Sequence, residues 1–113
     1  MHLPHPEAAV VESAKVRDYL LSHEHPIGRF KAVVFEAVGY HREAWHILQA
    51  DLLAIARLEG AVLSHSSIYG QKFSLSAILR GPSGHELPVV TIWFVRRGEV
   101  IPRFVTAYPG GRP

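Results

Sequence analysis

The stretch Tyr69-Gly70-Gln71-Lys72-Phe73-Ser74-Leu75-Ser76-Ala77-Ile78-Leu79-Arg80 alternates with a period of two, and it decides the second half of the fold. Its odd positions from 73 to 79 are apolar, whereas its even positions from 72 to 80 are mostly polar. Because successive side chains of a strand point to opposite faces of a sheet, the pattern predicts a strand with one buried face. Gly81-Pro82-Ser83-Gly84 is a strong turn signal after it.

The remaining second half predicts an antiparallel meander. Residues 87–97 are almost continuously apolar, which is typical of a central strand, and Pro88 lies near its start. Arg97-Gly98-Glu99 predicts a turn and residues 100–108 a last strand, while residues 61–66 would add a fourth strand. We therefore expect three to four antiparallel strands.

The first half has helical spacing instead. Residues 8–11 could be a short strand or an extended lead-in. Ser13 then predicts the N-cap of a short helix with Val16, Tyr19 and Leu20 on one face.

Two further helices follow a break at His25-Pro26. The second starts near Gly28, ends at Gly39 and places four apolar residues on its core face: Phe30, Val33, Val34 and Val38. The third runs from about 41 to 57, before Gly60, with an apolar face of Trp45, Leu48, Leu52 and Ile55. With the helices covering one face of the sheet, the sequence predicts an α+β fold.

Composition fits one domain, residues 1–113, with frayed ends at 1–7 and 109–113. The chain has 113 residues, 48% of them hydrophobic, and no cysteine. Disulfides and thiolate metal sites are therefore excluded, and a reducing, cytoplasmic location is expected. The sequence shows neither a signal-peptide layout at its start nor an apolar stretch long enough to span a bilayer. The net charge of +2 permits a polyanionic partner without requiring one.

The segment His25-Pro26-Ile27-Gly28-Arg29-Phe30-Lys31 combines an imidazole, a helix start and two cations. Amides at a helix N-terminus attract anions such as phosphate, and Gly28 would allow close approach. Arg29 and Lys31 lie where the helix dipole disfavours positive charge, a conflict that a bound anion would remove. In such a site, His25 could act as a general base. The alternative is an ordinary solvated loop and helix start.

The last strand carries a second candidate group. Strand alternation places Phe104, Thr106 and Tyr108 on one face and Arg103 on the other, unless a bulge redirects Arg103. Thr106 and Tyr108 could grip or polarise one phosphate, although both residue types are also common in ordinary strands. Three further residues could line an RNA groove or simply face water: Tyr69, Gln71 and Lys72.

Metal and cofactor sites are not expected. The pairs His23/His25 and His2/His5 could each supply two imidazoles, but the usual zinc spacings are missing from the sequence. Trp45 and Trp93 have apolar neighbours and are predicted to be core residues.

Several blocks spanning nearly the whole chain resemble a family of small uncharacterised bacterial domains. They are Lys15–Leu21, His25–Ala32, Phe35–Tyr40, Tyr69–Phe73, Trp93–Glu99 and Pro102–Tyr108. The family's architecture is similar to the barnase/EndoU/colicin/RelE class of metal-independent ribonucleases, many of which are toxins. That step is an analogy between folds.

The resemblance implies RNA cleavage by attack of the 2′-hydroxyl on the adjacent phosphate. His25 would then be the base or acid and Lys31 would stabilise charge, with Arg103 or Arg80 assisting. Thr106 and Tyr108 would hold or protonate phosphate oxygens. An antitoxin or immunity protein would restrain the enzyme. The rival hypothesis is a non-catalytic protein-binding module, such as an antitoxin, immunity or regulatory partner. A third hypothesis is a domain that only oligomerises.

Overall fold

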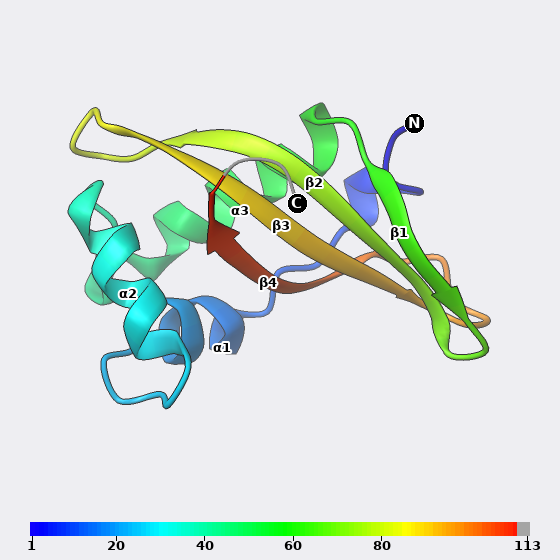
Figure 1. The fold of residues 1–113 in the computed structure, drawn as a ribbon, viewed down its shortest axis with the longest axis horizontal. Helices are drawn as coiled ribbons and strands as arrows, with labels where there is room; N and C mark the ends of the chain where they lie inside the picture. The colour runs from blue at the N-terminus through cyan, green and yellow to red at the C-terminus, as the bar shows by residue number, and fades with distance from the viewer. Residues whose placement is uncertain (111–113) are drawn as a thin grey trace.

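The computed structural model describes residues 1–110 as helical elements followed by a sheet (Figure 1). The helical elements are η1 (Pro6–Ala8), α1 (Ser13–Lys15), η2 (Val16–Leu20), α2 (Gly28–Ala37), η3 (Arg42–Ala44) and α3 (Trp45–Leu58). The strands are β1 (Val62–Ser67), β2 (Gly70–Arg80), β3 (Glu86–Arg96) and β4 (Arg103–Pro109). The predicted α+β class, with three helices before a four-stranded antiparallel sheet, is confirmed.

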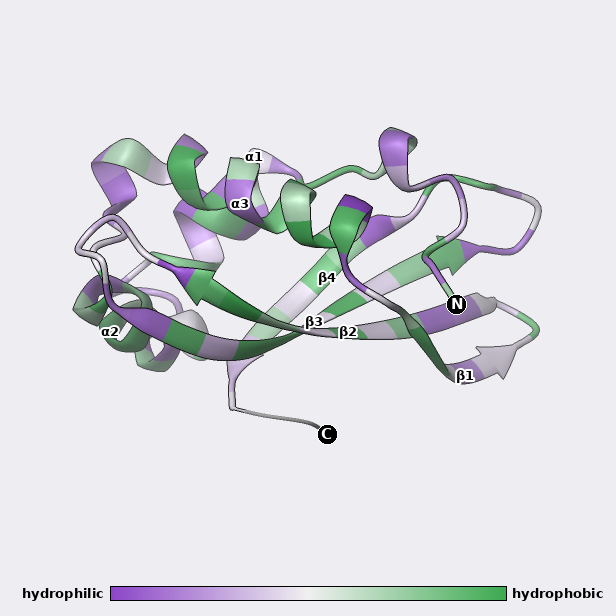
Figure 2. Cartoon of the chain, turned by 90° about the horizontal axis from the view of Figure 1, so that it is seen from above, coloured by the Kyte–Doolittle hydropathy of each residue, from purple (hydrophilic) through white to green (hydrophobic). Residues whose placement is uncertain are grey.

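The sheet is a meander in which each strand pairs with the next. β2 and β3 pair along their whole length, from Gly70 opposite Arg96 to Arg80 opposite Glu86. Figure 2 shows α1 and α3 on one side of this sheet. The apolar face predicted for β2 packs on that side, since Phe73 and Leu75 join Trp93 in the core.

Both ends of the chain depart from the predicted fraying. Leu3 is buried in the core and His2 forms a bridge with Gly60, because the N-terminal segment lies beside the start of β1. At the other end, Pro109 belongs to β4 and the Gly110 amide donates to the Pro88 carbonyl. The prediction of fraying for residues 111–113 lies outside the described residues.

The segment before the first helix is an extended lead-in with one pairing position. Val10 forms a parallel bridge with Arg103, and its carbonyl accepts the Phe104 amide. The last strand begins at Arg103 and not at Val100, and Pro102, which has no N–H to donate to a ladder, directly precedes it.

The core face predicted for α2 is right for Val38, which is buried just past the end of the helix, but wrong for Phe30 and Val33. Phe30 and Val33 are 66% and 60% exposed, whereas Ala32 and Phe35 are buried. The reason is that Gly28 packs against the backbone of η2, which turns the Gly28–Ala32–Phe35 side of the helix inward. Gly39 has the left-handed φ of 102° that the sequence predicts after this helix.

The apolar face predicted for α3 is confirmed, since Leu48, Leu52 and Ile55 are buried. The helix starts at Trp45 because residues 42–44 form a separate 3₁₀ turn before it. Trp93 is fully buried in the core, and Trp45 is partly buried and packs against the core cluster. Among residues 1–110, none of the helices has the length and apolar character needed to cross a membrane.

Candidate functional site

The site is built where η2, α2 and β4 meet. η2 is a π-helical turn in which the Leu21 amide donates to the Val16 carbonyl, five residues earlier. Such turns are rare in proteins, and many of those that exist lie at functional sites. Gly28 lets α2 approach η2 closely, because a Cβ at this position would lie only 1.8 Å from the Tyr19 carbonyl oxygen. This close approach brings Lys31, in the first turn of α2, beside the side chain of Tyr19.

Three side chains form a closed hydrogen-bonded triangle, which we call the Lys31 cluster: Tyr19, Lys31 and Thr106. The Lys31 Nζ donates to the Tyr19 Oη at 3.0 Å and to the Thr106 Oγ1 at 2.7 Å. The two hydroxyl oxygens are 2.8 Å apart, and either can be the donor. All three side chains are half-buried, so the cluster is both fixed and reachable from solvent.

The cluster keeps two hydrogen-bond donors free for a ligand. An ammonium has three N–H groups, and within residues 1–110 two of those on Lys31 are used in the triangle. Of the two hydroxyl protons, one is used between Tyr19 and Thr106, and the other remains available. One positive charge with a spare N–H and a spare O–H is a suitable arrangement for a phosphate oxygen.

The cluster also makes Tyr19 more acidic than an ordinary tyrosine. Burial alone raises the pKa of Tyr19, but the hydrogen bonds from Lys31 and Thr106 and the charges of Lys31 and Lys15 together lower it more. Its net pKa is therefore below the usual value of about 10. A phenol with a lowered pKa can release and recover a proton more easily than an exposed one.

His25 lies beside the cluster, but its role differs from the sequence-based prediction. Its Nδ1 accepts the amides of Ile27 and Gly28, both at 3.1 Å, so the imidazole itself caps the start of α2. The predicted open anion site at this helix N-terminus is therefore wrong. Because Nδ1 is an acceptor here, Nε2 carries the proton in the neutral ring. His25 then offers a donor to a ligand, not the free lone pair of a general base.

The remaining surface near His25 is an open cleft of about 630 Å³. The ring of His25 packs edge-on against the ring of Tyr19, with 4.9 Å between the ring centroids. Both residues line the cleft with Thr106 and Lys15. The cleft thus places an imidazole, a phenol, a hydroxyl and the Lys15 ammonium around one volume, together with the carboxylates of Glu12 and Asp18.

A β-bulge in β4 overturns the predicted sharing of faces. Ile92 pairs with Thr106 and Trp93 with Phe104, so Val105 is the extra residue. Phe104 therefore lies on the core face, opposite to Thr106. By the same register, Arg103 and Tyr108 pair with residues of the outer face, which Thr106 shares.

The outer face carries a further row of residues, two positions along β3 from the pair formed by Ile92 and Thr106. Lys72 pairs with Phe94, which in turn pairs with Arg103, so two cations flank an aromatic ring on neighbouring strands. Arg103 is held by an ion pair between its Nε and Glu99 Oε1, at 3.7 Å. Arg103 therefore contacts the loop before β4 and not the Lys31 cluster.

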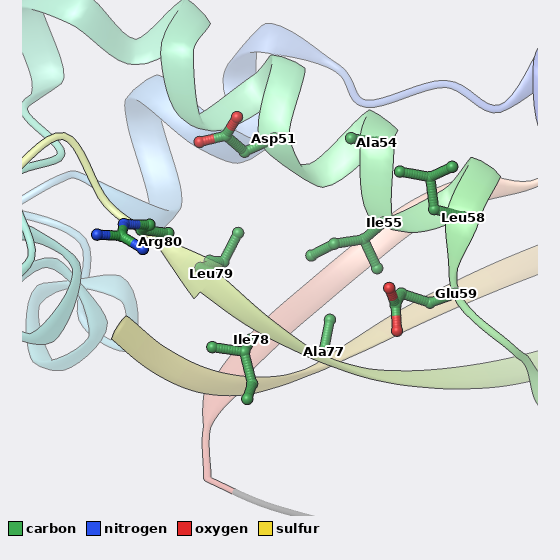
Figure 3. Close-up of a pocket in the computed structure, with 9 residues that line it drawn as sticks. All are labelled: Asp51, Ala54, Ile55, Leu58, Glu59, Ala77, Ile78, Leu79 and Arg80. Atoms are coloured by element: carbon green, nitrogen blue, oxygen red, sulfur yellow. The ribbon is translucent and has the colours of Figure 1, made fainter. Parts of the chain in front are cut away.

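Other predicted phosphate contacts lie elsewhere. Arg29 is exposed and stacks its guanidinium on the Phe30 ring, 4.9 Å from the centroid. Arg80 lines a separate hollow between α3 and β2 (Figure 3). Tyr69 lies in the turn between β1 and β2, and Gln71 follows it on the helix-facing side.

Tyr19 is the residue that the sequence-based reasoning missed as a functional group, because it was assigned only to the core face of the first helix. Its partners Lys31 and Thr106 are 12 and 87 residues away, so local patterns do not reveal them. One signal was present in the sequence: a hydroxyl at a core-facing position needs a partner when it is buried.

Comparison with known proteins places the chain in a family. Residues 2–111 match the model of a domain of unknown function, DUF6883, and the chain belongs to this family. Among curated proteins, none matches its sequence. In the solved contact-dependent growth inhibition toxin–immunity protein complex from Klebsiella pneumoniae 342, one chain is similar, with a TM-score of 0.72. The match has 19% identity and covers 90% of this chain and 100% of that one, which establishes a shared fold.

Proposed function

We propose that this protein is a metal-independent endoribonuclease of toxin type whose active site is the Lys31 cluster with His25. The observation that carries the proposal is the contact of one ammonium with two hydroxyl groups, at 2.7 and 3.0 Å, beside an open cleft. Preorganised donors of this kind stabilise charge that develops on a phosphate during reaction.

The proposed reaction is attack of an RNA 2′-oxygen on the adjacent phosphorus. The 2′-oxygen–phosphorus bond forms and the bond from phosphorus to the 5′-oxygen breaks, which leaves a cyclic phosphate and a 5′-hydroxyl. Tyr19 in its phenolate form accepts the 2′-hydroxyl proton, and in this form Thr106 carries the one remaining hydroxyl proton of the cluster. Lys31 and Thr106 stabilise the phosphorane oxygens, and His25 donates through Nε2. Tyr108, which shares the outer face with Thr106, gives a proton to the leaving oxygen.

In this proposal the phosphate binds at the Lys31 cluster and not at the start of α2, because the His25 side chain occupies the amides there. His25 therefore acts as a hydrogen-bond donor and not as a base. The row of Lys72, Phe94 and Arg103 supports an RNA substrate. Single-stranded nucleic acid is commonly bound by cations together with an aromatic side chain on which a base stacks.

The shared fold with one chain of a toxin–immunity protein complex supports a role in a toxin–immunity system, either as the toxin or as its immunity protein. An antitoxin or immunity protein would then restrain the activity, and the enzyme would act on RNA in the cytoplasm.

The chemical groups at the ends of the RNA fragments test the proposed reaction. Purified protein is incubated with total RNA in the presence of a chelator, and the fragment ends are analysed. We expect fragments with 2′,3′-cyclic phosphates from the wild type and from Tyr40→Phe, a phenol outside the cluster. Tyr19→Phe should lose most of the activity. Intact RNA with wild-type protein at high concentration would overturn the enzymatic proposal.

The second candidate function is a non-catalytic protein-binding module. A specific feature favours it: Ile27, Phe30 and Val33 recur every three residues along α2 and are 61%, 66% and 60% exposed. An apolar stripe of this kind is typical of a helix face that a protein partner covers. Intact RNA in the assay above would leave this function as the better account.

A further inference from the structure

β2 has a free edge over its second half. β1 pairs with β2 only as far as Val62 opposite Ser74. Within the part of the chain that the structure describes, residues 75–80 therefore have a strand neighbour on the β3 side alone. An exposed strand edge is a template for pairing with another strand.

The backbone groups along this edge point outward at every second residue. The Pro88 carbonyl accepts the Gly110 amide on the β4 side, so it points away from β2. In an antiparallel ladder the opposite residue, Ile78, then directs both its N–H and its C=O to the free edge. The same alternation applies to Ser76 and Arg80, which are exposed. The edge thus offers three consecutive donor and acceptor pairs.

Hollows flank the edge on both faces of the sheet. On the helix side, a hollow of about 260 Å³ lies between α3 and β2, with the exposed Leu58 on its wall (Figure 3). On the outer side, a second hollow of about 500 Å³ reaches Pro88. Ala77 and Ile78 line both hollows, and Ile78 is 63% exposed. In a second copy of this strand added at the edge, the exposed side chains of Ser76, Ile78 and Arg80 would all lie on one face of the joined sheet.

The edge carries one positive and one negative side chain, so the edges of two copies could be complementary in charge. Figure 3 shows Arg80 at one end of the hollow and Glu59 beside Ala77, toward the other end. Neither side chain forms an ion pair within residues 1–110. An antiparallel copy centred on Ile78 would place Arg80 opposite Ser76, which lines the same hollow as Glu59. Self-complementarity of this kind is what a two-fold interface requires.

We propose that the edge of β2 from Leu75 to Arg80 is the interface of a symmetric dimer. In the dimer, the segment pairs antiparallel with the same segment of a second copy about a two-fold axis at Ile78. The pairing would form about six backbone hydrogen bonds and two Arg80–Glu59 ion pairs across the interface. The two sheets become one continuous sheet of eight strands. This assembly is independent of the proposed ribonuclease activity.

Light scattering after size-exclusion chromatography tests the proposal. A protein concentration of about 100 µM is chosen so that a dimer with a dissociation constant in the micromolar range is populated. We expect a mass twice the 12.6 kDa of one chain for the wild type. Ile78→Lys should reduce the mass to that of a single chain. Ile68→Lys is the matched control, since Ile68 is 68% exposed but lies in the turn between β1 and β2. Circular dichroism establishes that each variant is folded.

Charge exchange tests the register and gives a second route if Ile78→Lys does not fold. Arg80→Glu and Glu59→Arg should each weaken the dimer by about tenfold, and the double variant should recover most of the affinity. Three results would overturn the proposal. They are a wild type with the mass of one chain, a dimer that survives Ile78→Lys, and a double variant as weak as the single ones.

Discussion

The contact between Gly28 and the backbone of η2 predicts a substitution whose effect has the opposite sign to helix propensity. Within a helix, replacing glycine by alanine usually stabilises a protein by about 1 kcal/mol. At Gly28, however, the added Cβ would lie 1.8 Å from the Tyr19 carbonyl oxygen and 2.7 Å from its carbonyl carbon. These are backbone atoms, so the clash is relieved only if η2 and α2 move apart.

Overpacking of this severity costs about 3 kcal/mol, the upper part of the usual range. After subtraction of the propensity gain of about 1 kcal/mol, we expect Gly28→Ala to lower the free energy of unfolding by about 2 kcal/mol. Because the same movement separates Tyr19 from Lys31, the variant should also lose RNA cleavage.

Urea unfolding followed by circular dichroism measures the change, with Gly60→Ala as the control. The nearest atom to a Cβ at Gly60 is the Met1 carbonyl oxygen at 3.6 Å, an ordinary contact. We expect Gly60→Ala to change stability by less than about 0.5 kcal/mol. If Gly28→Ala instead stabilises the protein, the close packing of α2 on η2 is refuted, and with it the structural origin of the Lys31 cluster.

Three further predictions concern the rest of the fold. Burial raises the pKa of Tyr40, and its hydrogen bond to the Asp51 carboxylate and the charge of Asp51 raise it further. The stability that this pair contributes should be complete below about pH 10 and should decline above it. Urea unfolding should show this decline in the wild type and not in Tyr40→Phe. Thr91→Val removes the acceptor of the buried Trp93 indole and should cost about 1–3 kcal/mol in calorimetry, so an unchanged melting temperature would contradict this hydrogen bond. Phe30→Ser should change stability by less than about 0.5 kcal/mol in thermal unfolding, since its side chain is 66% exposed, and a large loss would show that Phe30 is a core residue after all.

The sheet could be predicted from the sequence because its signals are local. The alternation between Lys72 and Arg80 requires only that one face be buried, and the register of β2 with β3 preserves it. The buried face of α3 could also be predicted, because Leu48, Leu52 and Ile55 recur there at helical spacing, although the same helix exposes Ile47 and Leu58.

The orientation of α2 could not be read in the same way, because the helix is apolar on two sides. Phe30 and Val33 form one apolar side, and Ala32 and Phe35 form the other. Hydrophobic periodicity does not decide between such sides. The decision comes from the contact of Gly28 with η2, which is a tertiary contact.

The candidate site was predicted in its parts but not in its arrangement. His25, Lys31 and Thr106 were each identified from local chemistry, whereas Tyr19 was assigned only to packing. The bulge at Val105 reversed the expected relation of Phe104 to Thr106, and alternation alone contains no sign of it. The interpretation of the start of α2 as an anion site failed because the His25 side chain caps that helix.

The central claim is that Lys31, held by Tyr19 and Thr106, stabilises a cleaved phosphodiester. Its most direct test is the rate of RNA cleavage by the wild type, Lys31→Met and Arg57→Met, each with a chelator present. Arg57 is an exposed cation in the last turn of α3, so its loss removes the same charge away from the cluster. We expect kcat/KM to fall by about 10²-fold or more for Lys31→Met and to stay near the wild-type value for Arg57→Met. Equal rates for Lys31→Met and the wild type would contradict the claim.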